Sequence, residues 1–415
     1  MLDVGRHPKV NVLAYSEIRE FSGQIGDFKV KVLKKARYVD PSRCTACGAC
    51  AEKCPTKVPN EFNFGLDDRK AIYKDYAQGI PSVYTIDPNN CKVIQGGKCG
   101  VCAKVCQAKA VDYEQKDSEV ELNVATVIVS TGYELFDATQ IPEYGYGKLP
   151  NVISSLEMER LLSAGGPTKG HLTRPSTIRF EKRLKELPKL IKKAEKSEDP
   201  TEKNKLEEEA KWLEEQTHKH HTATKLGFIQ CVGSRDFRFH KYCSSYCCMH
   251  SIKEAIIARE HESSTESFIF YMDLRTVGKG FEEYKVRGAK VSGLKYIRGR
   301  IAEIMQDEEY NPVVYYEDTE QRKVVGMSLD MVILANACSP SKGISQISTL
   351  LGIELDENGF VSTHPNKPLD TSVPGIFTCG CAQGPIDIPE SVAQASSAAA
   401  RAAEVVMTGG LALAV

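Results

Sequence analysis

Apolar runs of strand length recur along the chain, separated by polar or glycine-containing turns. Residues 10–14 and 28–32 are predicted strands, with the polar turn 22–27 between them. Residues 125–130, Ala-Thr-Val-Ile-Val-Ser, form a continuous run rich in β-branched side chains, which is typical of a buried parallel strand. This run ends at Thr131 and Gly132.

Beyond residue 222 the pattern alternates between strands and helices. A strand at 226–230 is followed by a helix at 251–259 and a strand at 267–271. Short strands at 330–335 and 375–378 and an Ala-rich helix from about Pro389 to Val406 complete the pattern. Such alternation favours an α/β class with a doubly wound parallel sheet.

A strongly charged segment, residues 176–222, interrupts this alternation. Leucines at helical spacing on both sides of Pro200 predict a helical hairpin whose charged face is solvated. Pro188 is expected to kink or shorten the first helix.

Composition narrows the classes of function. Lys and Arg total 54 against 55 for Asp and Glu, so the chain has no basic excess suited to nucleic acid. The N-terminus lacks an apolar secretion signal, and no run is long and apolar enough to span a membrane. We therefore expect a soluble, cytoplasmic protein, in which 15 cysteines indicate metal binding rather than disulfides.

Four cysteines followed by a proline carry the most specific motif. Cys44, Cys47, Cys50 and Cys54 precede Pro55 in a Cys-x2-Cys-x2-Cys-x3-Cys-Pro run. This run is typical of bacterial ferredoxins, in which three cysteines bind one [4Fe-4S] cluster and the fourth binds the neighbouring cluster.

A second group repeats the pattern with a longer first interval. It comprises Cys91, Cys99, Cys102 and Cys106. Exchange of the fourth ligand predicts two sets, Cys44, Cys47, Cys50 and Cys106 in one, and Cys91, Cys99, Cys102 and Cys54 in the other. Two four-cysteine zinc sites are the alternative, which the spacing disfavours.

A third group lies where a parallel strand passes into a helix. It comprises Cys231, Cys243, Cys247 and Cys248. The N-terminus of a helix favours an anion, and a thiolate-ligated cluster is anionic, so a third [4Fe-4S] cluster fits this position. Buried structural cysteines or a redox disulfide are the alternatives from spacing alone.

Four segments together resemble the A subunit of heterodisulfide reductase and the similar flavoprotein subunit of quinone-interacting membrane-bound oxidoreductase. They are residues 231–236, 243–249, 271–275 and 387–395. The resemblance implies three [4Fe-4S] clusters, FAD and a thioredoxin-reductase-like flavoprotein fold. The ferredoxin segment and the helical hairpin would be insertions in that fold.

The resemblance also implies where FAD would bind. The family's Gly-x-Gly-x-x-Gly turn for the FAD pyrophosphate precedes its ferredoxin module and is missing before Cys44, so we expect FAD to be shared with another chain. The second strand end, Ala335 to Cys338, departs from the family's Ala-Thr-Gly and disfavours a nicotinamide site. The expected FAD contacts are Thr131, Gly132, Gly380, Cys381, Gln383, Gly384, Ile388, Pro389, Glu390, Ser391 and Gln394.

These features predict six segments along the chain. They are a partial flavin-domain β segment (1–36), a dicluster ferredoxin insertion (37–115), flavin-domain strands (116–175), the charged hairpin (176–222), a second Rossmann-like domain with the third cluster (223–340) and the C-terminal part of the flavin domain (341–415).

Two hypotheses for the function follow. In the first, the chain is an iron–sulfur and FAD oxidoreductase subunit of an anaerobic multisubunit complex, relaying or bifurcating electrons. Its partners would resemble the B and C subunits of heterodisulfide reductase, a hydrogenase delta subunit, or a separately encoded N-terminal flavin-domain chain. In the second, it is a flavin-free iron–sulfur relay that connects other redox subunits.

Overall fold

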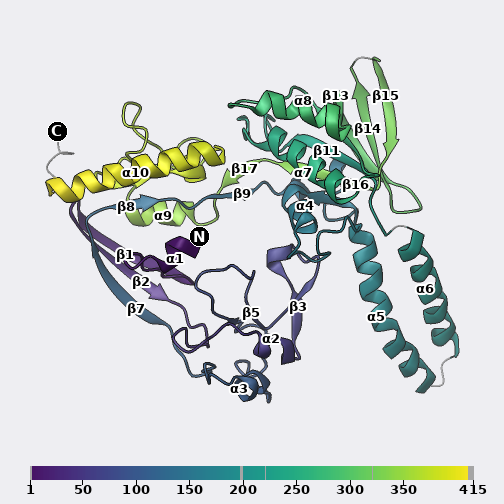
Figure 1. Ribbon diagram of the computed structural model, residues 1–415, viewed down its shortest axis with the longest axis horizontal. Helices are drawn as coiled ribbons and strands as arrows, with labels where there is room; N and C mark the ends of the chain where they lie inside the picture. Colours follow the sequence, from purple (N-terminus) through teal and green to yellow (C-terminus); the bar gives the residue numbers. More distant parts are fainter. Residues whose placement is uncertain (1, 197–199, 220, 320, 410–415) are drawn as a thin grey trace. The chain divides into compact units, whose positions relative to one another are not determined.

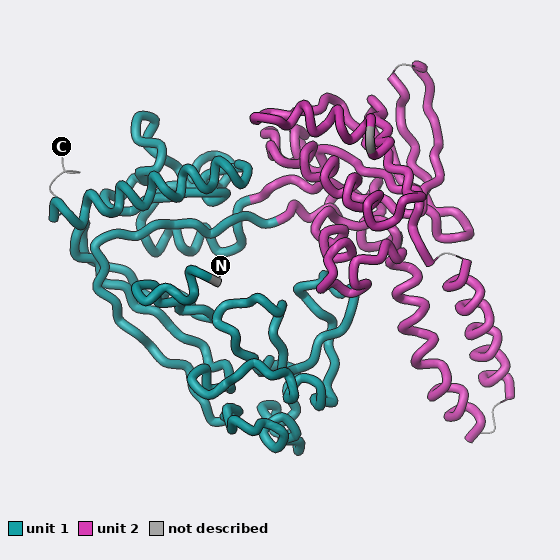
Figure 2. The backbone as a smooth tube through the Cα atoms, viewed as in Figure 1, with its two compact units in different colours: residues 1–134, 340–415 teal, residues 135–339 magenta. Residues whose placement is uncertain are grey.

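The computed structural model describes residues 2–409 except 197–199, 220 and 320. The chain divides into two compact units (Figure 2). Unit 1 comprises Met1–Glu134 and Pro340–Val415, and unit 2 comprises Leu135–Ser339. The six-segment division predicted from the sequence remains a prediction.

An antiparallel sheet in unit 1 has the order β1-β2-β7 (Figure 1). Its strands are β1 (Ser16–Gln24), β2 (Asp27–Lys34) and β7 (Ser118–Val124). β2 contains the strand predicted at 28–32, and its Phe28, Val30 and Val32 alternate on a buried face. The strand expected at 10–14 is wrong: these residues are in neither a helix nor a strand, and Val10 and Val12 are exposed.

Unit 1 also contains a short parallel pair beside two helices. β8 (Val127–Val129) pairs with β18 (Ile376–Thr378), so strands predicted near both positions are present. Ile128 is 39% exposed, however, because β8 belongs to a sheet of two strands among the described residues and only one of its faces is well covered. Helices α9 (Ile344–Leu351) and α10 (Ile388–Thr408) belong to this part of the unit.

The cysteine-rich segment of unit 1 leaves β2 and returns at β7, with only short elements between. They are α2 (Ala49–Lys53), β3 (Lys57–Pro59), η1 (Glu61–Asn63), β4 (Asp68–Lys70), β5 (Ile72–Tyr73), β6 (Thr85–Ile86) and α3 (Val101–Val105). Its buried core combines apolar residues with cysteines: Val39, Ile72, Val83, Ile86, Cys91, Cys102 and Ala110. The remaining N-terminal helix, α1, spans Leu2–Arg6.

Unit 2 is built on a sheet of seven strands in the order β10-β16-β11-β12-β13-β14-β15. Neighbours from β10 to β13 are parallel, which confirms the predicted α/β class. The parallel strands are β10 (Val152–Ser154), β16 (Met331–Asn336), β11 (Lys225–Val232), β12 (Glu266–Tyr271) and the start of β13 (Lys295–Gln306).

An antiparallel meander extends the sheet and was not predicted from the sequence. β13 continues past β12 to pair with β14 (Pro312–Asp318), which pairs with β15 (Lys323–Ser328). Short elements around the unit's start and end are β9 (Tyr133–Leu135), η2 (Ala138–Gln140), η3 (Pro142–Tyr144) and β17 (Cys338–Pro340).

Three helices of unit 2 stand near the parallel strands. They are α4 (Ser155–Leu162), α7 (Cys247–His261) and α8 (Phe281–Ser292). α7 contacts β11, β12 and β16 and also packs against α4 and α8. The predicted helix at 251–259 is therefore present and begins four residues earlier, at Cys247.

The charged segment forms the predicted pair of helices, α5 (Pro175–Lys196) and α6 (Pro200–Lys219). α5 continues through Pro188, so the expected shortening does not occur. Leu187 and Leu213 are buried, and Arg183 binds Glu209 through two hydrogen bonds of 2.7 and 3.0 Å. Among the described helices of the chain, none has both the length and the apolarity that a membrane span requires.

Candidate iron–sulfur and flavin sites

The first cysteine group surrounds helix α2. Gly48 precedes this helix with φ 86°, a left-handed conformation that glycine adopts without strain. Cys44, Cys50 and Cys54 are half-buried, whereas Cys47 is exposed. Cys106 lies across the same core, and its Sγ accepts a hydrogen bond of 3.3 Å from the Ala110 amide.

The second predicted set lines one small pocket. Its four cysteines all contribute to this pocket, together with apolar side chains such as Ile72 and Ile86: Cys54, Cys91, Cys99 and Cys102. Cys54 belongs to the first sequence group and lies among members of the second. The chain therefore brings together the four cysteines that the exchange of ligands predicts.

The thiols suit a positively charged inorganic group. All 15 cysteines lie within the described residues, and none forms a disulfide. Burial raises the pKa of Cys50 to about 11, with nearby Cys44 adding to the effect. Burial also raises the pKa of Cys102. Such clustered thiols resist ionisation unless cations offset the charge, and iron supplies that offset.

A tyrosine contacts one of these sulfurs. The Tyr113 hydroxyl lies 2.9 Å from the Sγ of Cys102. It can donate a hydrogen bond to a thiolate there, and donors to cluster sulfurs raise the reduction potential. Sequence reasoning missed Tyr113, because only the fold shows which of the 17 tyrosines meets a sulfur.

The third group lies at the carboxyl end of β11, as predicted. Cys231 is the last residue but one of that strand, and Cys247 and Cys248 are the first residues of α7. Burial, with nearby Cys248 and Cys243 adding to the effect, raises the pKa of Cys231 to about 11. Burial raises the pKa of Cys247 as well, and these three cysteines add to that effect. The four sulfurs thus belong to one electrostatic group, which fits a cluster.

Unusual backbone conformations hold this third group. Cys231 has φ 60° and Ser245 has φ 61°, in the left-handed region that side chains with a Cβ rarely adopt. Gly233 has φ 79°, and a Cβ there would lie 2.2 Å from Cδ1 of Phe136. Only glycine fits at position 233.

Main-chain amides also point at sulfurs of the third group. The Arg275 amide donates to Sγ of Cys248 at 3.5 Å, and the Ser245 amide to Sγ of Cys243 at 3.4 Å. Arg275 was noted only as part of a resembling segment, and its contact through the main chain left no signal in the sequence.

The expected FAD contacts gather at one edge of unit 1. Thr131 and Gly132 follow β8, and Gly380 and Cys381 follow the parallel strand β18. Parallel strands end at the same edge, so these residues are neighbours. The Gly380 amide donates to Oε1 of Gln394 on α10 at 2.9 Å.

Helix α10 presents its N-terminal end at this edge. Asp387 caps it by accepting a 2.8 Å hydrogen bond from the Glu390 amide, and Pro389 lies in its first turn. Ile388 is 79% and Val392 61% exposed. Gln383 and Gly384 lie just before the helix, and Ser391 donates to the Asp387 carbonyl at 2.7 Å. An uncovered apolar surface next to the capped N-terminus of α10 fits one side of a flavin.

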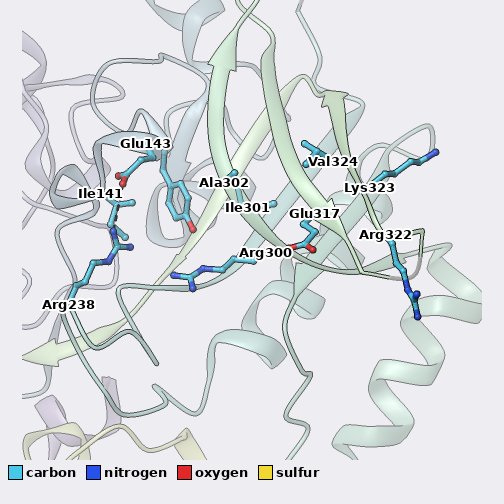
Figure 3. A pocket seen from close by; sticks show the side chains of 11 residues that line it. Ile141, Glu143, Arg238, Arg300, Ile301, Ala302, Glu317, Arg322, Lys323 and Val324 are labelled. Carbon is cyan, nitrogen blue, oxygen red and sulfur yellow. Dashed lines mark ion pairs between the residues drawn. The ribbon is translucent and has the colours of Figure 1, made fainter.

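A depression of about 550 Å³ in unit 2 has no cysteine among its described lining residues (Figure 3). Arg238 and Arg300 reach into it, but both lie within ion-pair distance of Asp236, at 2.9 and 3.5 Å. Glu143 also lies 3.7 Å from Arg238, so two acidic residues stand beside these two arginines, and we assign this depression no ligand.

Comparison with known proteins identifies first the class of this protein and then its family. Residues 37–60 match the 4Fe-4S binding domain, which places an iron–sulfur domain within an α/β protein. Over 403 residues the chain is 43% identical to the iron-sulfur A subunit of the CoB–CoM heterodisulfide reductase of Methanocaldococcus jannaschii, covering 96% of this chain and 54% of that protein.

Two further relatives agree. The chain is 39% identical to the A subunit of the H2:CoB-CoM heterodisulfide,ferredoxin reductase of Methanothermobacter marburgensis, covering 97% of this chain and 54% of that one. It is 39% identical to a protein of Archaeoglobus profundus that is named as similar to the same heterodisulfide reductase subunit, covering 100% and 59%. The chain belongs to the heterodisulfide reductase A-subunit family and spans little more than half the length of these relatives.

Among solved structures, thioredoxin reductases of T. acidophilum and Lactococcus lactis are similar at 13% identity, with TM-scores of 0.37 and 0.38. They cover 89% and 83% of this chain, and 89% and 86% of their own. At these scores the similarity adds nothing to the argument.

Proposed function

We propose that this chain is an electron-transfer part of a heterodisulfide-reductase-like oxidoreductase, with three [4Fe-4S] clusters and one edge of an FAD site. The observation that carries the proposal is the pocket lined by Cys54, Cys91, Cys99 and Cys102. A ligand contributed by the other sequence group is the pattern of two adjacent ferredoxin clusters. Two independent zinc sites would not require it.

The ferredoxin pair would pass electrons between its two clusters. Because each sequence group lends one cysteine to the other's cluster, the two clusters are necessarily neighbours. Exposed Cys47 and Cys99 would leave one side of each cluster open to a redox partner.

FAD would be bound by the edge formed by β8, β18 and α10. The N-terminus of α10 favours negative charge, which suits a flavin carrying extra electrons. When bound, FAD would hold up to two electrons and exchange them with the clusters singly, because each cluster carries one electron. The pyrophosphate contacts would come from residues outside these 415, whichever polypeptide carries them.

The relatives' names suggest the wider setting. They name heterodisulfide together with H2, formate or ferredoxin. We infer that this chain works with further redox subunits, in a cytoplasmic anaerobic complex, and that electron bifurcation at FAD is its role there.

The test is the cofactor content of the complete complex, purified anaerobically. We expect the iron of three clusters per chain and one FAD. Cys102→Ser should remove about a third of that iron. Cys379→Ser is the control, because this buried cysteine packs in an apolar core with Leu369 and Phe377.

Three outcomes separate the hypotheses. Full iron with FAD supports the proposal. Full iron without FAD would favour the flavin-free relay. Zinc in place of iron, or unchanged iron in Cys102→Ser, would refute the cluster assignment.

A further inference from the structure

Two glutamates and a histidine form a cluster in unit 2, between helices α4 and α7. Glu159 is on α4, and His250 and Glu254 are one turn apart on α7. Residues four apart on a helix share a face, and α4 packs against α7. One ligand atom from each residue lies within 4.8 Å of the other two.

Glu254 is the unusual member. Its side chain is 0% exposed, and neither carboxylate oxygen has a hydrogen-bond partner. A buried carboxylate that accepts no hydrogen bond is strongly unfavourable, and His250 is the one basic group within ion-pair distance of it among the described residues. A cation between Glu254 and its neighbours would remove this penalty.

The spacing of the donor atoms suits such a cation. His250 Nε2 lies 3.0 Å from Oε1 of Glu159 and 3.4 Å from Oε1 of Glu254. Ligands about 2.1 Å from a tetrahedral ion are roughly 3.4 Å from one another. The three atoms therefore need only small movements to surround an ion.

The charges of the three side chains and the exposure of Glu159 also favour a cation site. Glu159 currently pairs with Lys253, whose side chain is 38% exposed and can turn toward water. The Glu159 side chain is 33% exposed, which leaves the site open on one side for a water ligand. Two carboxylates with a neutral imidazole match the charge of a divalent ion.

We propose that Glu159, His250 and Glu254 bind one divalent transition-metal ion, such as Zn²⁺ or Mn²⁺, through one imidazole nitrogen and two carboxylate oxygens. This site is separate from the three cysteine groups and does not depend on the proposed electron-transfer function. The ion would join α4 to the helix whose first residues are Cys247 and Cys248. Its role would be to fix the position of α7.

Mn²⁺ binding to the anaerobically purified, cluster-containing protein tests the proposal. Mn²⁺ prefers oxygen and nitrogen ligands over thiolates, and loss of its free-ion EPR signal reports binding. After chelator treatment, the wild-type protein should bind one Mn²⁺ per chain, which Zn²⁺ displaces. Glu254→Gln and Glu159→Gln should each weaken binding at least tenfold.

Glu260→Gln is the matched control, because Glu260 lies on α7 but is exposed, and it should bind like the wild type. Should Glu254→Gln fail to fold, Glu159→Gln decides, since its partly exposed side chain tolerates an amide. The proposal is refuted if the wild type leaves the free Mn²⁺ signal unchanged. Equal binding by wild type and the folded Gln variants refutes it as well.

Discussion

Hydrogen bonds to the cysteine sulfurs are a feature through which single residues would set the reduction potentials of the proposed clusters. Tyr113 contacts Cys102 through its hydroxyl, whereas main-chain amides contact Cys106, Cys243 and Cys248. Of these four contacts, the tyrosine contact is the one that a side-chain substitution can remove. It therefore gives the most direct test of how the protein sets a potential.

Tyr113→Phe is expected to lower the midpoint potential of the cluster bound by the pocket cysteines. The hydroxyl stabilises the more electron-rich reduced cluster, and a hydrogen bond of about 1 kcal/mol corresponds to roughly 40 mV for one electron. Redox titration followed by EPR measures the shift.

Tyr76→Phe serves as the control, because the Tyr76 ring stacks on Phe62 at 5.1 Å. Its potentials should match the wild type. An unchanged potential in Tyr113→Phe would show that the hydroxyl does not donate to the cluster.

Residue-level prediction from the sequence succeeded where the signal was local. The cysteine intervals predicted which cysteines would come together in the pocket, since short loops limit where each thiol can point. Ligand identity and the FAD contacts remain predictions. Glu159 gave no signal, because its neighbours His250 and Glu254 are about 90 residues away and meet it only through helix packing.

At the scale of the elements, the connection from β11 to α7 has a strongly constrained backbone. Gly233, Arg235 and Ser245 in this connection have positive φ, as does Cys231 near the end of β11. In a nucleotide-binding fold this connection would be a short glycine-rich turn. Here it is long enough to bring Cys243 back to the strand end that carries Cys231.

Gly233→Ala should destabilise unit 2 by about 2–4 kcal/mol, because the new methyl group meets Phe136 and the backbone is left-handed. Thermal unfolding under anaerobic conditions checks this, and the iron of the third group should be lost first.

Gly293→Ala measures the cost of backbone strain without steric crowding by a neighbouring side chain. Gly293 also has a positive φ, 64°, but nothing lies within 4 Å of an added Cβ. We expect a loss of only about 1 kcal/mol there. Equal melting temperatures for the two variants would contradict the role assigned to Phe136.

Elements predicted from periodicity were found when they had a full hydrophobic pattern. β11, β12, β16 and α7 lie within a few residues of their predicted positions. The stretch 10–14 has apolar residues but no partner strand, and pairing rather than pattern decides whether a strand forms. The β13–β15 meander was missed, although Val313 to Tyr316 of β14 are β-branched and aromatic residues typical of a strand.

At the scale of the molecule, the α5–α6 hairpin is an appendage of unit 2. Its two ends are adjacent: the Ala223 amide donates to the Leu172 carbonyl at 2.7 Å, and Thr173 bridges Thr222. A segment whose ends already meet can be shortened without separating the strands that flank it.

Replacing residues 182–215 with a short Gly/Ser linker should therefore leave iron content unchanged and lower the melting temperature by only a few degrees. The modest loss reflects removal of Trp212, whose ring packs edge-on against Phe180 at 5.5 Å. Loss of the third group's iron in this variant would show that the hairpin supports the cluster site.

The pairing of β8 with β18 sets an order of events during synthesis. Thr378 bonds to Val129 across 249 positions of sequence, and all of unit 2 is made between them. The eight ferredoxin cysteines leave the ribosome long before β18 does. Iron delivery to that segment can thus precede completion of the edge that would receive the flavin, so a stalled or truncated chain would carry metal but no place for the organic cofactor.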